Sequence, residues 1–386
     1  MKCIYAVILF PFFLHSCQSR NKKEDALFSM ENITRANLQT ITVEVEDFNF
    51  EDLGNFLEVT SYIQLAAEPL LASIQEIQIK NEKIYIHDKF ARIICYDMQG
   101  KLKIDAKGAG PGEYTDVNTF VINEQSRELI IYDNHKQSLL FYNADNGIFF
   151  KTQKLVKPDP TAMASLGGVY YYDNRYHSNY PNDTDLYYSL LVSKNAMTMD
   201  RHYFPHNDAE SSYRFRPTRQ PFSYNDSVLY YCRNFDNVIY ELNPDSLKAL
   251  YKIMLPDPLP FSKIENKING WELVNSKYSL GLESIYECNN LLYFQFSKDG
   301  FLQSALYDLI QEKQIYCGKR LTDKVGKSVP IFQLIDGVYK GQFWGVLTPE
   351  TIGYALSKEP KDYPDIFRKY DPDTDNPIIA FYKVVQ

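Results

Sequence analysis

One pattern recurs along this chain: a strand, an aspartate, a short turn, a second strand and a closing turn. It is clearest in "KIYIHDKFARIICYDMQGKL" at 83–102 and "ELIIYDNHKQSLLFYNADNGIF" at 128–149. Looser copies lie at 167–195, 228–250, 291–316 and 334–385. Each copy alternates apolar and polar residues between turns rich in Gly, Asn, Asp or Pro, which is typical of antiparallel hairpins.

A repeat of this size buries its hydrophobic faces only by stacking on its neighbours. Because no crossover helix is predicted between the copies, we expect an all-β chain: a six-bladed β-propeller of four-stranded antiparallel blades. We expect the ring to be closed by an N-terminal strand at 58–65 that pairs with a C-terminal strand at 378–385. A β-sandwich is the alternative, but it does not explain why the same pattern keeps returning.

The composition favours β-structure and argues against one class of partner. The chain has 386 residues with 31 Tyr and 24 Phe, residues that pack well on a pleated sheet. Its formal net charge is -8, and it has no basic stripe that would neutralise phosphates. We therefore expect no nucleic-acid binding.

The N-terminus is typical of an exported lipoprotein. Lys2 precedes an apolar run at 4–14 that is too short to span a bilayer, and "LHSCQS" places Cys17 where a bacterial lipobox has its lipidated cysteine. A plain secretory peptide with an incidental Cys17 is the alternative. We expect an outer-membrane lipoprotein on the cell surface or the periplasmic face, anchored in the membrane through acyl chains. The predicted organisation is a signal peptide at 1–16, a lipidated cysteine and flexible tether at 17–39, an N-terminal extension at 40–57 and the propeller at 58–386.

Two stretches carry a resemblance to known propellers. "IYIHDKFARIICYDMQG" resembles the NHL-type repeat, with Tyr85, Asp88, Arg92, Tyr96 and Gly100 in matching roles. The loop "KGAGPGEY" and the two chain ends are similar to the six-bladed β-propeller lipoproteins of Bacteroidetes. The resemblance implies an envelope-anchored interaction module whose partners are outer-membrane transport proteins of a nutrient-uptake system, a glycan or a peptide.

The glycine-rich loop after the first repeat is the most distinctive local motif. A phosphate-binding P-loop is a poor match, because the lysine precedes the glycines and a strand follows. The glycines instead permit a turn between two blades, and the loop is a candidate binding surface on one rim. The residues of this candidate are Lys107, Gly108, Gly110, Pro111, Gly112, Glu113 and Tyr114.

Three aspartates occupy equivalent places in the repeats: Asp88, Asp133 and Asp173. We interpret them as turn residues whose carboxylates accept from backbone N–H groups. A ring of carboxylates near a central channel is the alternative. The acidic turn "DPDTDNP" at 371–377 lacks the glycine and glutamate of a calcium loop, and Pro205 disfavours a helical pairing of His202 with His206.

No catalytic residue or metal ligand is therefore predicted. No hydrolase motif appears, so a binding protein is favoured over an enzyme, with a channel-centred, metal-assisted carbohydrate hydrolase or lyase as the alternative. No cofactor is predicted, although calcium is left open. The candidate recognition loops are 156–165, 176–185, 205–220 and 255–277.

The cysteines outside the signal peptide and lipobox form no metal-binding pattern. Cys95 and Cys232 lie in apolar runs and are expected to be buried. Whether Cys288 and Cys317 pair is left open.

Overall fold

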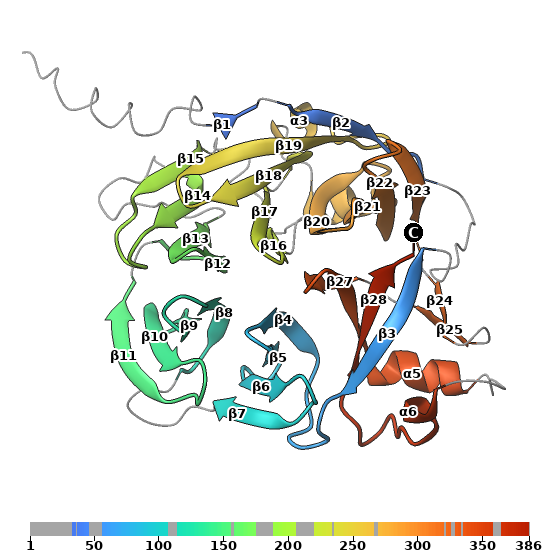
Figure 1. Ribbon diagram of the computed structural model, residues 1–386. Helices are drawn as coiled ribbons and strands as arrows, with labels where there is room; N and C mark the ends of the chain where they lie inside the picture. The colour runs from blue at the N-terminus through green and yellow to red at the C-terminus, as the bar shows by residue number, and fades with distance from the viewer. Residues whose placement is uncertain are drawn as a thin grey trace, which may run out of the picture.

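The chain forms a β-propeller, in which small sheets stand like spokes around a common centre (Figure 1). The computed structural model describes residues 33–35, 37–45, 56–106, 114–155, 158–174, 188–205, 220–233, 235–265, 269–319, 322–325, 329–332, 335–357 and 364–385. Within these residues, no helix is long and apolar enough to cross a membrane.

Four sheets are antiparallel and four-stranded. The first two follow each other along the chain and contain β4 (Ile74–Lys80), β5 (Lys83–Asp88), β6 (Ile93–Asp97) and β7 (Leu102–Ala106), then β8 (Val117–Asn123), β9 (Glu128–Asp133), β10 (Ser138–Asn143) and β11 (Phe149–Lys154). The other two contain β12 (Ala162–Leu166), β13 (Val169–Asp173), β14 (Tyr188–Ser193) and β15 (Arg201–Pro205), and β20 (Leu280–Cys288), β21 (Leu291–Lys298), β22 (Phe301–Asp308) and β23 (Lys313–Gly318).

The other large sheet has ten strands. They are β1 (Ile33–Thr34), β2 (Gln39–Thr42), β3 (Leu57–Gln64), β16 (Phe222–Asn225), β17 (Val228–Cys232), β18 (Val238–Asn243), β19 (Ser246–Met254), β26 (Gly337–Tyr339), β27 (Gln342–Leu347) and β28 (Ile378–Val384). A separate ribbon pairs β24 (Thr322–Val325) with β25 (Val329–Phe332). The helices are short: α3 (Phe261–Glu265), α4 (Gly270–Val274), α5 (Pro349–Leu356) and α6 (Asp365–Arg368).

This connectivity corrects the predicted six separate blades. Four blades of four strands are present, and the remaining propeller strands belong to the ten-stranded sheet. The physical reason is a parallel bridge between Asn225 of β16 and Val338 of β26, which joins two groups of strands by backbone pairing. The strand predicted at 58–65 is β3, and it pairs antiparallel with β28 inside this larger sheet rather than in a separate, ring-closing sixth blade.

The hydrophobic core lies between neighbouring sheets of the propeller. One cluster packs Tyr85 of β5 against Phe120 and Ile131 of the next sheet, and another packs Tyr171 of β13 against Tyr231 of β17. Each side chain presents its flat or branched surface to the adjacent sheet, so both faces of a narrow sheet are removed from water. This packing explains the tyrosine-rich composition, since many of the largest fully buried side chains are tyrosines.

Each recurring aspartate ends the second strand of its sheet and accepts hydrogen bonds from the loop that precedes that sheet. Asp88 is fully buried and accepts hydrogen bonds from the backbone N–H groups of Ala72, Phe90 and Arg92. Asp133 accepts from the N–H groups of Thr115 and Lys136. These contacts confirm the interpretation as turn residues for both carboxylates.

Asp173 also accepts a hydrogen bond from a hydroxyl group on a neighbouring group of strands. Its carboxylate accepts from Thr161 Oγ1 at 2.9 Å and from the Tyr231 hydroxyl at 3.2 Å. Tyr231 belongs to a neighbouring group of strands, so this aspartate also links one spoke to the next.

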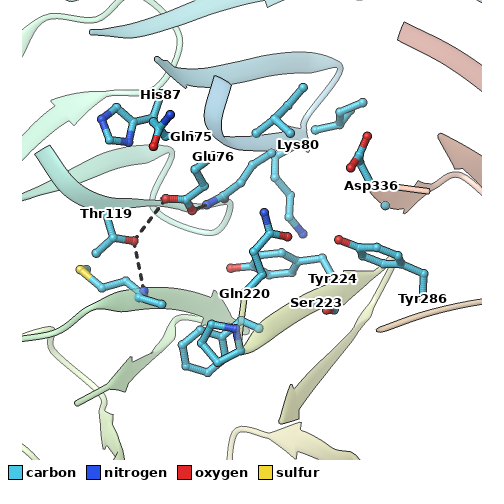
Figure 2. Close-up of a pocket in the computed structure, with 18 of the residues that line it drawn as sticks. Gln75, Glu76, Lys80, His87, Thr119, Gln220, Ser223, Tyr224, Tyr286 and Asp336 are labelled. Atoms are coloured by element: carbon cyan, nitrogen blue, oxygen red, sulfur yellow. Dashed lines mark hydrogen bonds between the residues drawn. The ribbon is translucent and has the colours of Figure 1, made fainter. Parts of the chain in front are cut away.

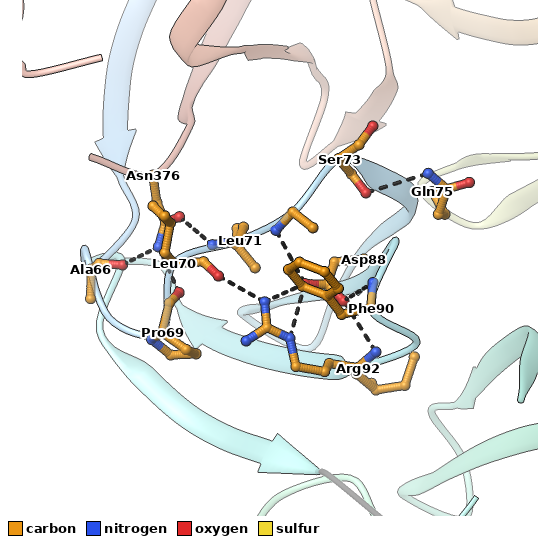
Figure 3. Close-up of polar contacts among 12 residues, drawn as sticks. Ala66, Pro69, Leu70, Leu71, Ser73, Gln75, Asp88, Phe90, Arg92 and Asn376 are labelled. Carbon is orange, nitrogen blue, oxygen red and sulfur yellow. Dashed lines mark hydrogen bonds and ion pairs between the residues drawn. The ribbon is translucent and has the colours of Figure 1, made fainter. Parts of the chain in front are cut away.

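A polar cluster anchors the segment that leads into β4 (Figure 3). The amide of Asn376, just before β28, accepts from Leu71 N and donates to the carbonyl oxygens of Ala66 and Pro69. The Arg92 guanidinium donates to the Leu70 carbonyl and forms an ion pair with Asp88. The acidic turn at 371–377 therefore ends in a buried structural residue.

A substitution at Gly100 tests how closely β3 packs against the first blade. A Cβ at Gly100 would lie 1.9 Å from the Gln64 carbonyl oxygen, and its φ of +74° is strained for other residues. Gly341 has a similar φ of +70° but nothing within 4 Å, so it is a matched control. We expect Gly100→Ala to lower the free energy of unfolding by about 2 kcal/mol more than Gly341→Ala in urea denaturation. Equal losses would contradict this packing.

Candidate functional site

A cavity of about 370 Å³ lies at the centre of the propeller, where the first strands of successive sheets face one another (Figure 2). Its volume is within the usual range for small-molecule sites. The lining residues come mainly from β4, β8, β12, β16 and the start of β26. Gln75, Asn118 and Gln220 line the cavity and are exposed, so they mark its opening to solvent.

Strand β4 supplies the polar wall. Glu76, Gln78 and Lys80 alternate with Ile77 and Ile79, so the three polar side chains share one face of the strand. The isoleucines pack into the cluster shared with β27 and β28. The alternation therefore places polar groups in the interior of the ring while the other face of the strand remains in the core.

The Glu76 carboxyl is held by neutral donors. Gln78 Nε2 donates to its Oε1 at 2.8 Å, and Thr119 Oγ1 donates to its Oε2 at 3.4 Å. Gln78 Nε2 also donates to the Phe120 carbonyl at 3.1 Å. Gln78 Oε1, by contrast, is buried without a hydrogen-bond partner among the residues that the structure describes.

Lys80 is a buried cation that is already compensated. Its Nζ forms an ion pair with Glu124 at 3.2 Å and lies 3.9 Å from the centre of the Tyr224 ring. Burial lowers the pKa of the Lys80 ammonium, and the Glu124 carboxylate opposes that shift. The Tyr224 hydroxyl is fixed in turn by accepting from Ser165 N at 2.8 Å.

A second carboxyl group enters from the opposite part of the lining. Asp336 precedes β26, and its Oδ2 accepts from Val346 N at 2.8 Å. Burial raises the pKa of Asp336 to about 7, and burial also raises the pKa of Glu76 to about 7. Both side chains keep part of their surface open to the cavity. Two acids that titrate near neutrality therefore face one polar space.

Most residues of the predicted rim site lie outside the described part of the chain, namely Lys107, Gly108, Gly110, Pro111, Gly112 and Glu113. Tyr114 is described and buried: its hydroxyl accepts from Ile93 N at 2.9 Å, and its ring packs edge-on against Tyr142. The rim site stays a prediction, with Tyr114 in a structural position. Cys17 also lies outside the described residues.

The remaining predictions have mixed outcomes. Cys95 and Cys232 are buried as expected, and Cys288 and Cys317 are also buried and are not joined by a disulfide. The candidate loop at 156–165 contributes Thr161, and Gln220 ends the loop at 205–220. Among the described residues, no three His, Cys, Asp or Glu side chains are grouped as metal ligands would be.

Sequence reasoning missed Glu76, Gln78, Lys80 and Asp336. The alternation in "IQEIQIK" at 74–80 is a usable signal, because three polar residues share one face of a predicted strand. Nothing local marks Asp336, whose backbone N–H donates to the Trp344 carbonyl and whose carboxyl lies near Tyr286 of another sheet.

Comparisons with known proteins agree with the fold. A family model described as "Domain of unknown function (DUF4934)" matches residues 38–383. A Bacteroides fragilis structure, provisionally described as an exported protein, has a TM-score of 0.72 at 15% identity and covers 90% of this chain and 100% of its own. A duf4221 family member from Bacteroides vulgatus has a TM-score of 0.52 at 10% identity, over 86% of this chain and 99% of its own. No curated protein matches. The resemblance seen in the sequence is thus supported at the level of a propeller, while its NHL-like details stay predictions.

Proposed function

This chain belongs to the DUF4934 family, and we propose that it acts as a binding protein of the bacterial cell envelope that holds a small polar ligand in its central cavity. The proposal includes the lipid anchor at Cys17 and a location at the outer membrane. The export-type N-terminus and the exported relative of similar fold support that location. A role beside an outer-membrane uptake system fits a tethered binding domain.

The observation that carries the proposal is the Gln78 amide oxygen. It is an acceptor on a side chain only 6% exposed, in the lining of a cavity with polar walls, and no described residue donates to it. Leaving such a group unpaired costs about 1–3 kcal/mol, so interiors rarely keep one without a water or ligand donor. A hydrogen-bond donor on a ligand would satisfy this acceptor.

Blocking the cavity distinguishes ligand binding inside it from ligand binding on the outer surface of the protein. Gln220→Trp places a bulky ring at the opening, and Gln311→Trp places the same ring on an exposed turn away from it. We expect compounds from a panel of amino acids, small peptides, sugars and polyamines to raise the melting temperature of the wild type and of Gln311→Trp but not of Gln220→Trp. Equal shifts in all three proteins, or no shift in any, would contradict the proposal.

A further inference from the structure

Two carboxyl groups in the cavity lack a cation. Glu76 is contacted by an amide and a hydroxyl, and Asp336 by a backbone N–H. In the described part of the chain, neither forms a salt bridge. Lys80 does not fill this role, because its ammonium is bound to Glu124 and covered by the Tyr224 ring. The cavity therefore contains two acids whose charge no described side chain balances.

The surroundings of these acids offer little positive charge. His87 pairs with Glu76 in the β4–β5 register, and burial lowers the pKa of its imidazole, which favours the neutral ring. Tyr286 and Tyr293 are the titratable neighbours of Asp336, and burial raises the pKa of both phenols, so both remain neutral. Tyr224 is neutral for the same reason. Ionising either carboxyl thus leaves a desolvated charge in the ring.

We propose, building on the proposed function, that the ligand is an organic cation whose ammonium or guanidinium group pairs with the carboxyl of Glu76 or Asp336 in this cavity. Such a group supplies positive charge and several N–H donors, and Gln78 Oε1 is an acceptor in the same lining that still needs one. The aromatic rings of Tyr286 and Trp344 line the same cavity and suit the apolar part of the molecule. A neutral sugar would hydrogen-bond to the carboxyl groups but would leave their charges unbalanced.

A proton balance follows from this pairing. Near pH 7 each carboxyl in the empty protein is partly protonated, whereas a bound cation favours the ionised form. Binding therefore releases protons from Glu76 and Asp336 to the buffer, and affinity rises with pH up to the point where both are ionised. A neutral ligand produces no such release.

Isothermal titration with α,ω-diamines of three to eight carbons tests the inference, with diols of equal length as neutral probes and calcium chloride as an inorganic one. We expect the full-length protein to bind one diamine length best and each diol at least about ten-fold more weakly. Glu76→Gln and Asp336→Asn should each weaken the best diamine by about 10- to 100-fold, while Glu58→Gln, on an exposed carboxylate, leaves affinity unchanged. Titrations in buffers of different ionisation enthalpy at pH 7 should show proton release.

The outcomes separate the two proposals. If diols bind as tightly as diamines and Gln220→Trp abolishes the binding of both, the proposal of a cationic ligand is overturned. The proposal of binding in the cavity then stands. Saturable calcium binding that prevents diamine binding would overturn the proposal that the ligand is an organic cation. Absence of diamine binding at every length overturns this inference, and the cavity-blocking comparison decides the proposed function independently.

Discussion

Asp88→Ala is expected to lower the free energy of unfolding by about 3–5 kcal/mol, the largest loss among the substitutions considered. The carboxylate is completely buried and accepts from three backbone N–H groups as well as from Arg92 Nε at 3.0 Å. Alanine would leave these donors unpaired and would leave the mostly buried Arg92 guanidinium without its counter-ion. The first blade and the segment that leads into β4 would lose their common anchor.

Urea denaturation at pH 7 measures this loss, and Asp365→Ala is the matched control because that carboxylate is 91% exposed. The control should change stability by less than about 0.5 kcal/mol. Burial raises the pKa of Asp88, but the Arg92 guanidinium and the backbone donors outweigh burial and hold it below its usual 3.8. The stabilisation is therefore present above pH 3.8 and is lost as the pH falls through the lower, folded-state pKa. A loss below 1 kcal/mol at pH 7 would contradict the proposed anchoring.

Glu76→Gln is expected to act in the opposite direction and to stabilise the empty protein by about 2–3 kcal/mol at pH 8. Burial raises the pKa of Glu76 from 4.5 to about 7, so the folded state holds its proton more tightly than the unfolded chain does. The wild type has the full benefit of protonation below pH 4.5 and loses it as the pH rises through 7. Glutamine resembles the protonated acid and avoids that loss.

The measurement is urea denaturation of the wild type, Glu76→Gln and Glu58→Gln at pH 5 and pH 8. The gain in the free energy of unfolding of Glu76→Gln over the wild type should be small at pH 5 and close to its maximum at pH 8. Glu58→Gln should have the stability of the wild type at both pH values. If the stability difference between Glu76→Gln and the wild type does not grow with pH, the Glu76 carboxyl is not desolvated. Together with the weaker diamine binding expected of the same variant, the result would show a site that trades stability for ligand recognition.

The strands were largely predictable because their signals are local. The alternation and turn residues around Asp88 and Asp133 predict β5, β6, β9 and β10 from short windows of sequence. The division into sheets was not predictable in the same way. The Asn225–Val338 bridge joins residues more than a hundred positions apart, and no local pattern encodes it.

The candidate site was predictable only in part for a similar reason. The polar face of "IQEIQIK" is visible in the sequence, but a strand at any water-exposed sheet would show the same alternation. Only the arrangement of sheets turns that face inward, beside Thr119 and Tyr224. Asp336 acquires its unusual environment from Val346 on a nearby strand and from Tyr286 and Tyr293 on a distant sheet, and no local pattern encodes that combination.

A crystal structure of the protein grown at pH 8 with the tightest-binding diamine tests the central claim most directly. The account predicts the diamine inside the ring, with a nitrogen within hydrogen-bond distance of a Glu76 or Asp336 carboxylate oxygen and a donor facing Gln78 Oε1. A cavity that holds only water, with the diamine bound on the outer surface, would contradict it.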